Sequence, residues 1–131
     1  MIIGKKKDIS FIDILSLIKC PEKYHWKIVW IYAFYYPSNL VYLEDKINSS
    51  KGYDIKLEDL KRLIESVGQL IELILIGDKG IIEDYSIEKK EEIKNKYDFF
   101  IEYVDSSYWE IFSKDNDFSN KLKEFDTNSK E

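Results

Sequence analysis

Alternation of side chains with a period of two is clearest in the stretch YHWKIVWIYAFYY, residues 24–36. Aromatic and β-branched residues of this kind favour a strand, and Pro37 ends the run. A strand over these thirteen residues is long, so a bend or bulge is expected within it. One face of the strand would carry an aromatic stripe, which we interpret as core: Tyr24, Trp26, Ile28, Trp30, Tyr32, Phe34 and Tyr36.

Four other stretches have apolar residues at the spacing of one helical face, and they predict helices within residues 7–21, 55–68, 84–97 and 114–125. Ser10 and Asp13 form the pattern of a capping box at the start of the first helix, and Pro21 stops it. The third is highly charged and has Ile87 and Ile93 as its anchors, which is typical of a surface helix. The fourth begins at Asp115, a favourable N-cap.

Two further stretches predict strands. Residues 69–77, QLIELILIG, are almost continuously apolar, as expected for a strand buried on both faces, and Glu72 is the exception among them. Residues 98–113 contain two alternating runs around a polar turn and predict a hairpin. Residues 37–54 are the least regular, and their Leu40, Leu43 and Ile47 fit either a short helix or an edge strand.

The resulting order is helix, strand, helix, strand, helix, strand, strand, helix. It predicts a single domain, residues 1–131, of the α/β (α+β) class, with a single-layer mixed sheet of four to five strands and packed helices. The two strand-helix-strand connections are expected to be right-handed crossovers. One sheet-centred core would then bury Trp26, Trp30, Ile71, Leu73, Ile101 and Ile111.

The charge and composition limit the possible partners. The net charge is −5, and residues 78–131 carry fifteen acidic residues against nine lysines, a balance of −6. Arg62 is the only arginine, although arginine is the residue best suited to bidentate phosphate recognition. We therefore expect no nucleic-acid partner, and a basic protein partner is compatible with the charge. The abundance of Lys and Ile indicates AT-rich codons and hence a bacterial or phage source.

The chain carries no sign of export or of membrane insertion. Cys20 is the only cysteine, so an internal disulfide is excluded. The first residues, MIIGKKKDIS, lack the apolar core of a signal peptide, and no stretch reaches the roughly 18 to 20 apolar residues of a membrane helix. We expect a cytoplasmic protein with no membrane partner; its oligomeric state stays open.

No catalytic motif is present, and we expect that the protein is not an enzyme and binds no cofactor and no metal. His25 is the only histidine and has neither a nucleophile motif nor other zinc ligands near it in sequence. Glu72 and Glu102 are unusual because each interrupts an apolar strand. A small carboxylate-site enzyme that used one of them together with His25 stays open as an alternative.

The closing segment, residues 97–125, carries a pattern at Phe100, Glu102, Asp105, Ser106, Tyr108, Trp109, Glu110, Ile111, Lys114 and Asp115. This pattern resembles the C-terminal hairpin and helix of some immunity proteins of bacterial polymorphic-toxin and contact-dependent-inhibition systems. The resemblance covers about 30 of the 131 residues and implies a non-catalytic protein that binds and blocks a toxin domain, often a basic nuclease. A phage or mobile-element regulator that inhibits a host protein is the alternative.

The hairpin itself suggests where such a partner would bind. A two-residue turn at Ser106 and Ser107 would place acids and tyrosines on one face, extended by two acids at the start of the last helix. The predicted partner-binding residues are Tyr103, Asp105, Tyr108, Glu110, Asp115 and Asp117. For Tyr103 and Tyr108, simple coverage of the core is the competing interpretation.

Overall fold

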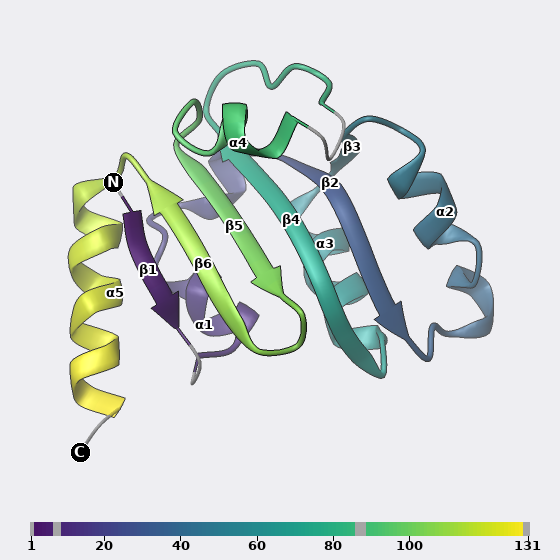
Figure 1. Cartoon of the computed structure of the whole chain (residues 1–131), viewed down its shortest axis with the longest axis horizontal. Helices are drawn as coiled ribbons and strands as arrows, with labels where there is room; N and C mark the ends of the chain where they lie inside the picture. The colour runs from purple at the N-terminus through teal and green to yellow at the C-terminus, as the bar shows by residue number, and fades with distance from the viewer. Residues whose placement is uncertain (1, 7–8, 86–88, 130–131) are drawn as a thin grey trace.

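The computed structural model describes the backbone of residues 2–6, 9–85 and 89–129, and the side chains of residues 9–85 and 89–124. Within these residues, six strands form one antiparallel sheet in the order β1-β6-β5-β4-β2-β3 (Figure 1). The strands are β1 (Ile2–Lys6), β2 (His25–Phe34), β3 (Tyr53–Ile55), β4 (Gln69–Asp78), β5 (Phe99–Val104) and β6 (Tyr108–Ser113). The helices are α1 (Phe11–Ser16), α2 (Leu43–Asn48), α3 (Leu57–Ser66), α4 (Lys90–Ile93) and α5 (Asn116–Ser129), with 3-10 turns η1 (Pro21–Lys23) and η2 (Ser38–Leu40).

The predicted α+β class, one sheet with helices packed on it, is confirmed. The sheet is antiparallel rather than mixed, and it has six strands within the described residues rather than four to five. The unpredicted edge strand β3 explains part of the difference, because it lies on the far side of β2 from β4. Helix α3 therefore connects β3 to β4 across β2, and β2 runs against both. The other unpredicted strand, β1, pairs with β6 at the opposite edge.

Most of the predicted elements are found. Strand β2 ends just before Pro37, and β4 and the β5–β6 hairpin occupy the expected ranges. The capping box at α1 is formed, with the Asp13 amide donating to Ser10 Oγ at 3.1 Å and the Ser10 amide donating to Asp13 Oδ2 at 3.3 Å. The ambiguous segment after Pro37 forms a short helix, α2, followed by the edge strand β3.

The long helix predicted within residues 84–97 is wrong over the part that the structure describes. Only Lys90–Ile93 is helical, and the predicted anchor Ile87 lies outside the described residues. The chain on either side is held by other contacts: Tyr97 and Ile82 are buried on the sheet, and Asp84 pairs with Lys27. These tertiary contacts prevail over a helical pattern that had only two apolar anchors.

The sheet buries a separate apolar cluster on each face. On the first face, α1, α3 and α5 cover a cluster that includes Trp26, Leu73, Ile101 and Ile111 (Figure 1). On the second face, a smaller cluster forms around α4: Val29, Ile74, Ile76, Ile82, Ile93, Tyr97, Phe100 and Phe112.

The prediction of one core holding both Trp30 and Ile71 is therefore wrong. The register shifts between Ile28 and Trp30, so Trp30 turns to the second face, where it is half-buried. A second irregularity pairs Tyr32 with Glu72 and Ala33 with Leu70, so Ile71 is passed over and is also half-buried. A bulge of this kind reverses the side on which the following residues point. The expected bend within the strand is confirmed.

Candidate functional site

Helix α4 covers only one end of the second face of the sheet. In Figure 1 it lies at one end of β4 and β5, and no helix of the described chain covers the other end on that side. The alternation and register of the strands place six residues on this uncovered part and two more, Glu102 and Glu110, at its border with α4, where they pair with Lys90 and Lys94. We call it the open half and define it as Trp30, Tyr32, Phe34, Glu72, Glu102, Val104, Tyr108 and Glu110.

One side of the open half is aromatic. Tyr32 and Phe34 are 37 % and 44 % exposed, and their rings meet edge to face with centroids 5.5 Å apart. Tyr35 extends this group, at 6.2 Å from the Phe34 ring, and is 79 % exposed. The Trp30 ring is half-buried beside them, and its Nε1 is shielded from solvent without a hydrogen-bond acceptor among the described residues. Exposed aromatic groups of this kind are typical of protein contact sites.

The other side of the open half is acidic. Glu102 of β5 lies directly opposite Glu110 of β6, and Glu72 lies on the neighbouring strand β4. Lys90 Nζ is 3.1 Å from Glu102 Oε2, and Lys94 Nζ is 3.7 Å from Glu110 Oε1. Glu72 has no ion pair or side-chain hydrogen bond within the part of the chain that the structure describes. Two of the three carboxylates on these adjacent strands thus pair with a lysine, and Glu72 does not within the described residues.

Lys94 lies between Glu91 of its own segment and Glu110 of the open half, with its Nζ 2.9 Å and 3.7 Å from their carboxylate oxygens. Burial by itself would lower the pKa of Lys94, whose side chain is only 15 % exposed. The hydrogen bond and charge of Glu91, together with the charges of Glu110 and Glu102, instead raise the pKa. Glu91 is thus the main reason that the pKa of Lys94 is raised, and the two glutamates of the open half add to its effect.

The structure divides the predicted partner-binding residues among three places. Tyr108 and Glu110 belong to the open half, and Asp105 is exposed in the adjoining turn. Tyr103 lies on the first face, with its ring 4.6 Å from that of Trp109. Residues paired across antiparallel strands share a face, so Tyr103 lies on the same face as Trp109. The neighbours of Tyr103 along β5, Glu102 and Val104, lie on the opposite face.

The other two predicted residues lie at the far end of β6. Asp115 caps α5, since the Phe118 amide donates to its Oδ1 at 3.1 Å, and Asp117 pairs with Lys121 at 3.7 Å. The six-residue strand puts them about 20 Å from the turn. The expected two-residue turn is also wrong: Val104 pairs with Tyr108, so residues 105–107 form the turn, and Asp105 and Ser106 have positive φ. The predicted residues do not form one face.

Sequence reasoning missed the aromatic side of the open half. The sequence predicts Tyr32 and Phe34 as core, because they continue the stripe that begins at Trp26. The bulge and the short reach of α4 leave them uncovered, and neither feature is visible in a periodicity. Glu72 was the available signal, because a charge within an apolar strand needs an exposed face or a partner.

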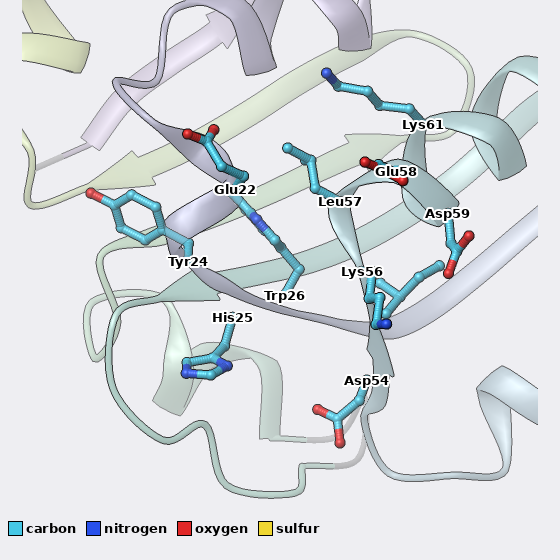
Figure 2. A pocket seen from close by; sticks show the side chains of 11 residues that line it. Glu22, Tyr24, His25, Trp26, Asp54, Lys56, Leu57, Glu58, Asp59 and Lys61 are labelled. Carbon is cyan, nitrogen blue, oxygen red and sulfur yellow. The ribbon is translucent and has the colours of Figure 1, made fainter.

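The catalytic alternative required His25 near Glu72 or Glu102. His25 pairs with Asp78 at one end of β4, whereas Glu72 pairs with Tyr32 towards the other end, so the structure does not bring them together. His25 instead borders an open groove of about 1080 Å³ between β2, β3 and α3, which Figure 2 shows with charged side chains of both signs, including Glu22, Asp54, Lys56, Glu58 and Lys61. No group of three His, Cys, Asp or Glu residues suited to a metal occurs among the described residues.

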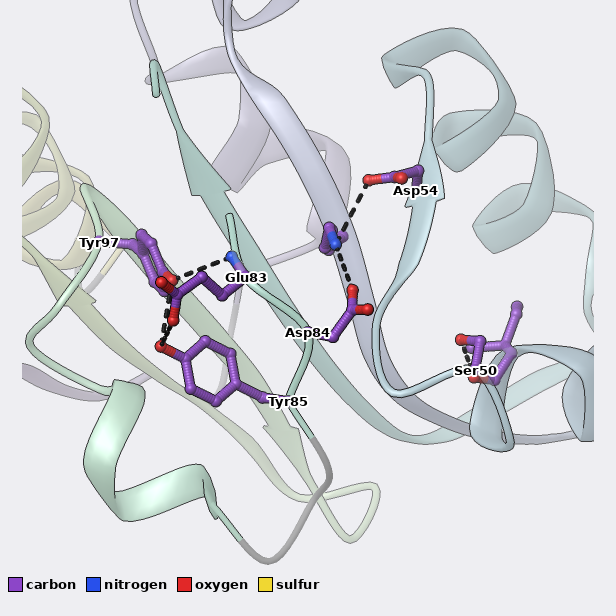
Figure 3. Close-up of polar contacts among 8 residues, drawn as sticks. Ser50, Asp54, Glu83, Asp84, Tyr85 and Tyr97 are labelled. Carbon is purple, nitrogen blue, oxygen red and sulfur yellow. Dashed lines mark hydrogen bonds and ion pairs between the residues drawn. The ribbon is translucent and has the colours of Figure 1, made fainter. Parts of the chain in front are cut away.

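The polar contacts beside this groove hold the fold together. Lys27 is buried in β2, and its Nζ is 2.7 Å from Asp84 and 3.8 Å from Asp54 (Figure 3). These pairs connect β2 to the edge strand β3 and to the segment after β4. The hydrogen bond and charge of Lys27 lower the pKa of Asp84. Near them the hydroxyls of Tyr85 and Tyr97 lie 3.3 Å apart.

No family model, no curated protein and no solved structure matches this chain. In the described part of the chain, no helix has both the length and the apolar character needed to cross a membrane.

Proposed function

We propose that this chain is a non-catalytic binding protein that neutralises a basic toxin domain by direct contact, as an immunity protein does. The observation that carries the proposal is the open half of the sheet, where exposed aromatic rings lie beside glutamates that outnumber their lysines. Interfaces draw most of their energy from a few aromatic or charged residues, and charge complementarity speeds the encounter.

The two sides of the open half would act differently in this complex. Tyr32 and Phe34 are large, partly exposed and already in contact with one another, so little conformational entropy is lost when a partner covers them. Glu72 lies opposite Tyr32 in the sheet, so a cation there would be held at the edge of the aromatic group. A second copy of the chain is a poor occupant, because the interface would oppose glutamate to glutamate.

The proposal includes a cytoplasmic location and no cofactor. A single thiol, that of the half-buried Cys20, suits a reducing compartment. An inhibitor that acts by covering its target needs complementary shape and charge, and it needs no reacting group of its own.

Capture of partners from the native host tests the proposal, with wild-type, Tyr32→Ala and Glu72→Lys proteins as baits. We expect the wild type to recover a basic protein whose toxicity it suppresses, and each variant to bind it at least about tenfold more weakly, a loss of about 1.4 kcal/mol. Glu65→Lys is the matched control, because it makes the same change at an exposed position of α3, on the other side of the sheet.

Two results would overturn the proposal. One is recovery of no protein partner by the wild-type bait. The other is a partner that binds the Tyr32 and Glu72 variants as tightly as it binds the control. If only the Asp117→Lys variant lost binding, the contact surface would lie at the start of α5 and not on the open half.

A further inference from the structure

Helix α4, together with Lys94 directly after it, shows how lysines one helical turn apart fit this face of the sheet. Lys90 and Lys94 are four residues apart and reach Glu102 and Glu110, which lie opposite one another on β5 and β6. One helical turn rises 5.4 Å, and neighbouring strands lie about 4.8 Å apart. Lysines at this spacing therefore meet glutamates on successive strands when the helix lies across the strands.

The acidic row continues beyond the part that α4 covers. Glu72 on β4 has no cation within the described residues, and Asp105 is exposed in the turn next to it. The turn is held against β4, because the Ser106 amide donates to the Ile71 carbonyl at 2.8 Å. Glu102 and Glu110 already form ion pairs with Lys90 and Lys94. The unoccupied acids thus lie on the side of the row away from α4.

We propose that the partner contributes a basic amphipathic helix, which lies across the strands on the open half, beside α4. This inference rests on the proposed function and names the part of the partner that is recognised. Its apolar side would cover Tyr32, Phe34 and Val104, and its lysines or arginines would face Glu72 and Asp105.

Two physical arguments favour a helix over an extended segment. The contact is made with a face of the sheet, and no edge beside it is free for strand addition: β4, β5 and β6 have strand neighbours on both sides, and Asn48 and Glu44 bond the outer backbone groups of β2 beyond Ile28. A helix satisfies its own backbone hydrogen bonds as it covers such a face, whereas an extended chain would bury unpaired amides.

The size of the surface also suits one helix. Four strands, β2, β4, β5 and β6, contribute to the open half, which gives a width of roughly 15 to 19 Å. A helix of about 10 to 13 residues has that length, and its diameter of about 10 Å matches roughly three residues along each strand.

A synthetic helix tests the inference on the full chain. The probe is a fourteen-residue peptide with acetyl and amide ends, lysines at i and i+4 on one side and leucines on the adjoining side. A peptide of the same composition with scrambled order keeps the charge but loses the amphipathic face, and a third peptide has glutamates in place of the lysines. Binding is followed by titration calorimetry and by the NMR signal of the Trp30 indole N–H.

We expect the amphipathic peptide to bind at least about tenfold more tightly than the scrambled one and to shift the Trp30 signal. Glu72→Lys should weaken this binding about tenfold, and Glu65→Lys should leave it unchanged. Equal binding of both lysine peptides, or shifts confined to residues around His25, would overturn the inference.

The outcome is separable from that of the proposed function. If the captured partner loses affinity for Glu72→Lys but the peptide is not recognised, the helical occupant is wrong and the contact surface stands. If neither the partner nor the peptide responds to the open half, both proposals fall.

Discussion

At the scale of single residues, Asn48 completes the sheet where its edge strand stops. Strand β3 pairs with β2 only as far as Ile28, which leaves the backbone of Ile31 facing outwards. The Asn48 amide group donates to the Ile31 carbonyl at 2.8 Å, and its Oδ1 accepts from the Ile31 amide at 2.9 Å. One side chain thus makes the two hydrogen bonds that a neighbouring strand would make.

Glu44, one turn earlier on α2, also bonds to the outer edge of β2 in place of a neighbouring strand. Its Oε2 accepts from the Ala33 amide at 3.2 Å and from the Tyr36 hydroxyl at 2.6 Å. Burial, followed by the hydrogen bond to Glu44 and its charge, raises the pKa of Tyr36. Two side chains, those of Asn48 and Glu44, therefore make hydrogen bonds along the edge of β2 that β3 leaves unpaired.

We expect Asn48→Ala to lower the free energy of unfolding by about 1 to 3 kcal/mol, because it leaves the amide and carbonyl of Ile31 without their partners. Urea denaturation monitored by circular dichroism measures the change. Asn39→Ala removes an exposed amide from η2 and should change stability by less than about 0.5 kcal/mol. Equal stability of the two variants would show that water replaces Asn48 at this edge.

At the scale of secondary-structure elements, the longest contact is that between β2 and β4, and it depends on one glycine. Gly77 lies opposite Trp26, and a β-carbon at Gly77 would collide with the Trp26 indole ring. The absence of a side chain lets that indole lie over β4, where it stacks against Phe99 with centroids 6.0 Å apart. Trp26 Nε1 donates to the Pro21 carbonyl at 3.0 Å, which fixes the ring in place.

Gly77→Ala should therefore destabilise the protein by about 1 to 3 kcal/mol, because the indole must leave its position against Phe99. Thermal unfolding gives the loss, and the near-ultraviolet circular dichroism of the tryptophans should change with it. The control is Gly80→Ala, where a β-carbon would meet only Asp78 Oδ2, at 3.2 Å. Unchanged stability in Gly77→Ala would mean that Trp26 contributes little to the pairing of these strands.

At the scale of the whole molecule, the distribution of acids makes stability depend on pH in two opposed ways. Asp98 is half-buried near Asp78 where β4 and β5 meet, and burial, followed by the charge of Asp78, raises its pKa. Asp84 is exposed, and the hydrogen bond and charge of Lys27 lower its pKa. A raised carboxyl pKa destabilises the fold once the group is ionised, whereas a lowered one stabilises it.

We expect Asp98→Asn to increase the free energy of unfolding at pH 7, where the native state carries the penalty of the ionised carboxylate. The gain should shrink as the pH falls through the raised native pKa and vanish below the ordinary value of about 3.9. Asp84→Asn should do the opposite, with a loss at pH 7 that disappears as the pH falls through the lowered native pKa. Urea titrations between pH 3 and pH 7 measure both, and parallel curves for the two variants would contradict this account.

Particular residues show which parts of the fold could be predicted from the sequence. Ser10, Asp13 and Asp115 specify their helix starts through local hydrogen bonds, and these were predictable because each bond spans only three residues. Strand β3 was not predicted, because three residues carry too little periodicity. Of the candidate site, Tyr108 and Glu110 were predicted, whereas Tyr32 and Phe34 were assigned to the core.

The sequence by itself determined the fold class, the position of the long strands and the helix caps, since these depend on residues close together along the chain. It also determined the excess of acidic residues, which is a matter of composition. The tertiary structure alone decided which face each side chain occupies, because one bulge turns Trp30 to the second face and another leaves Ile71 out of the pairing. It also decided what stays uncovered. Helix α4 ends after Ile93, and the aromatic rings of β2 and the carboxylate of Glu72 remain accessible beside it.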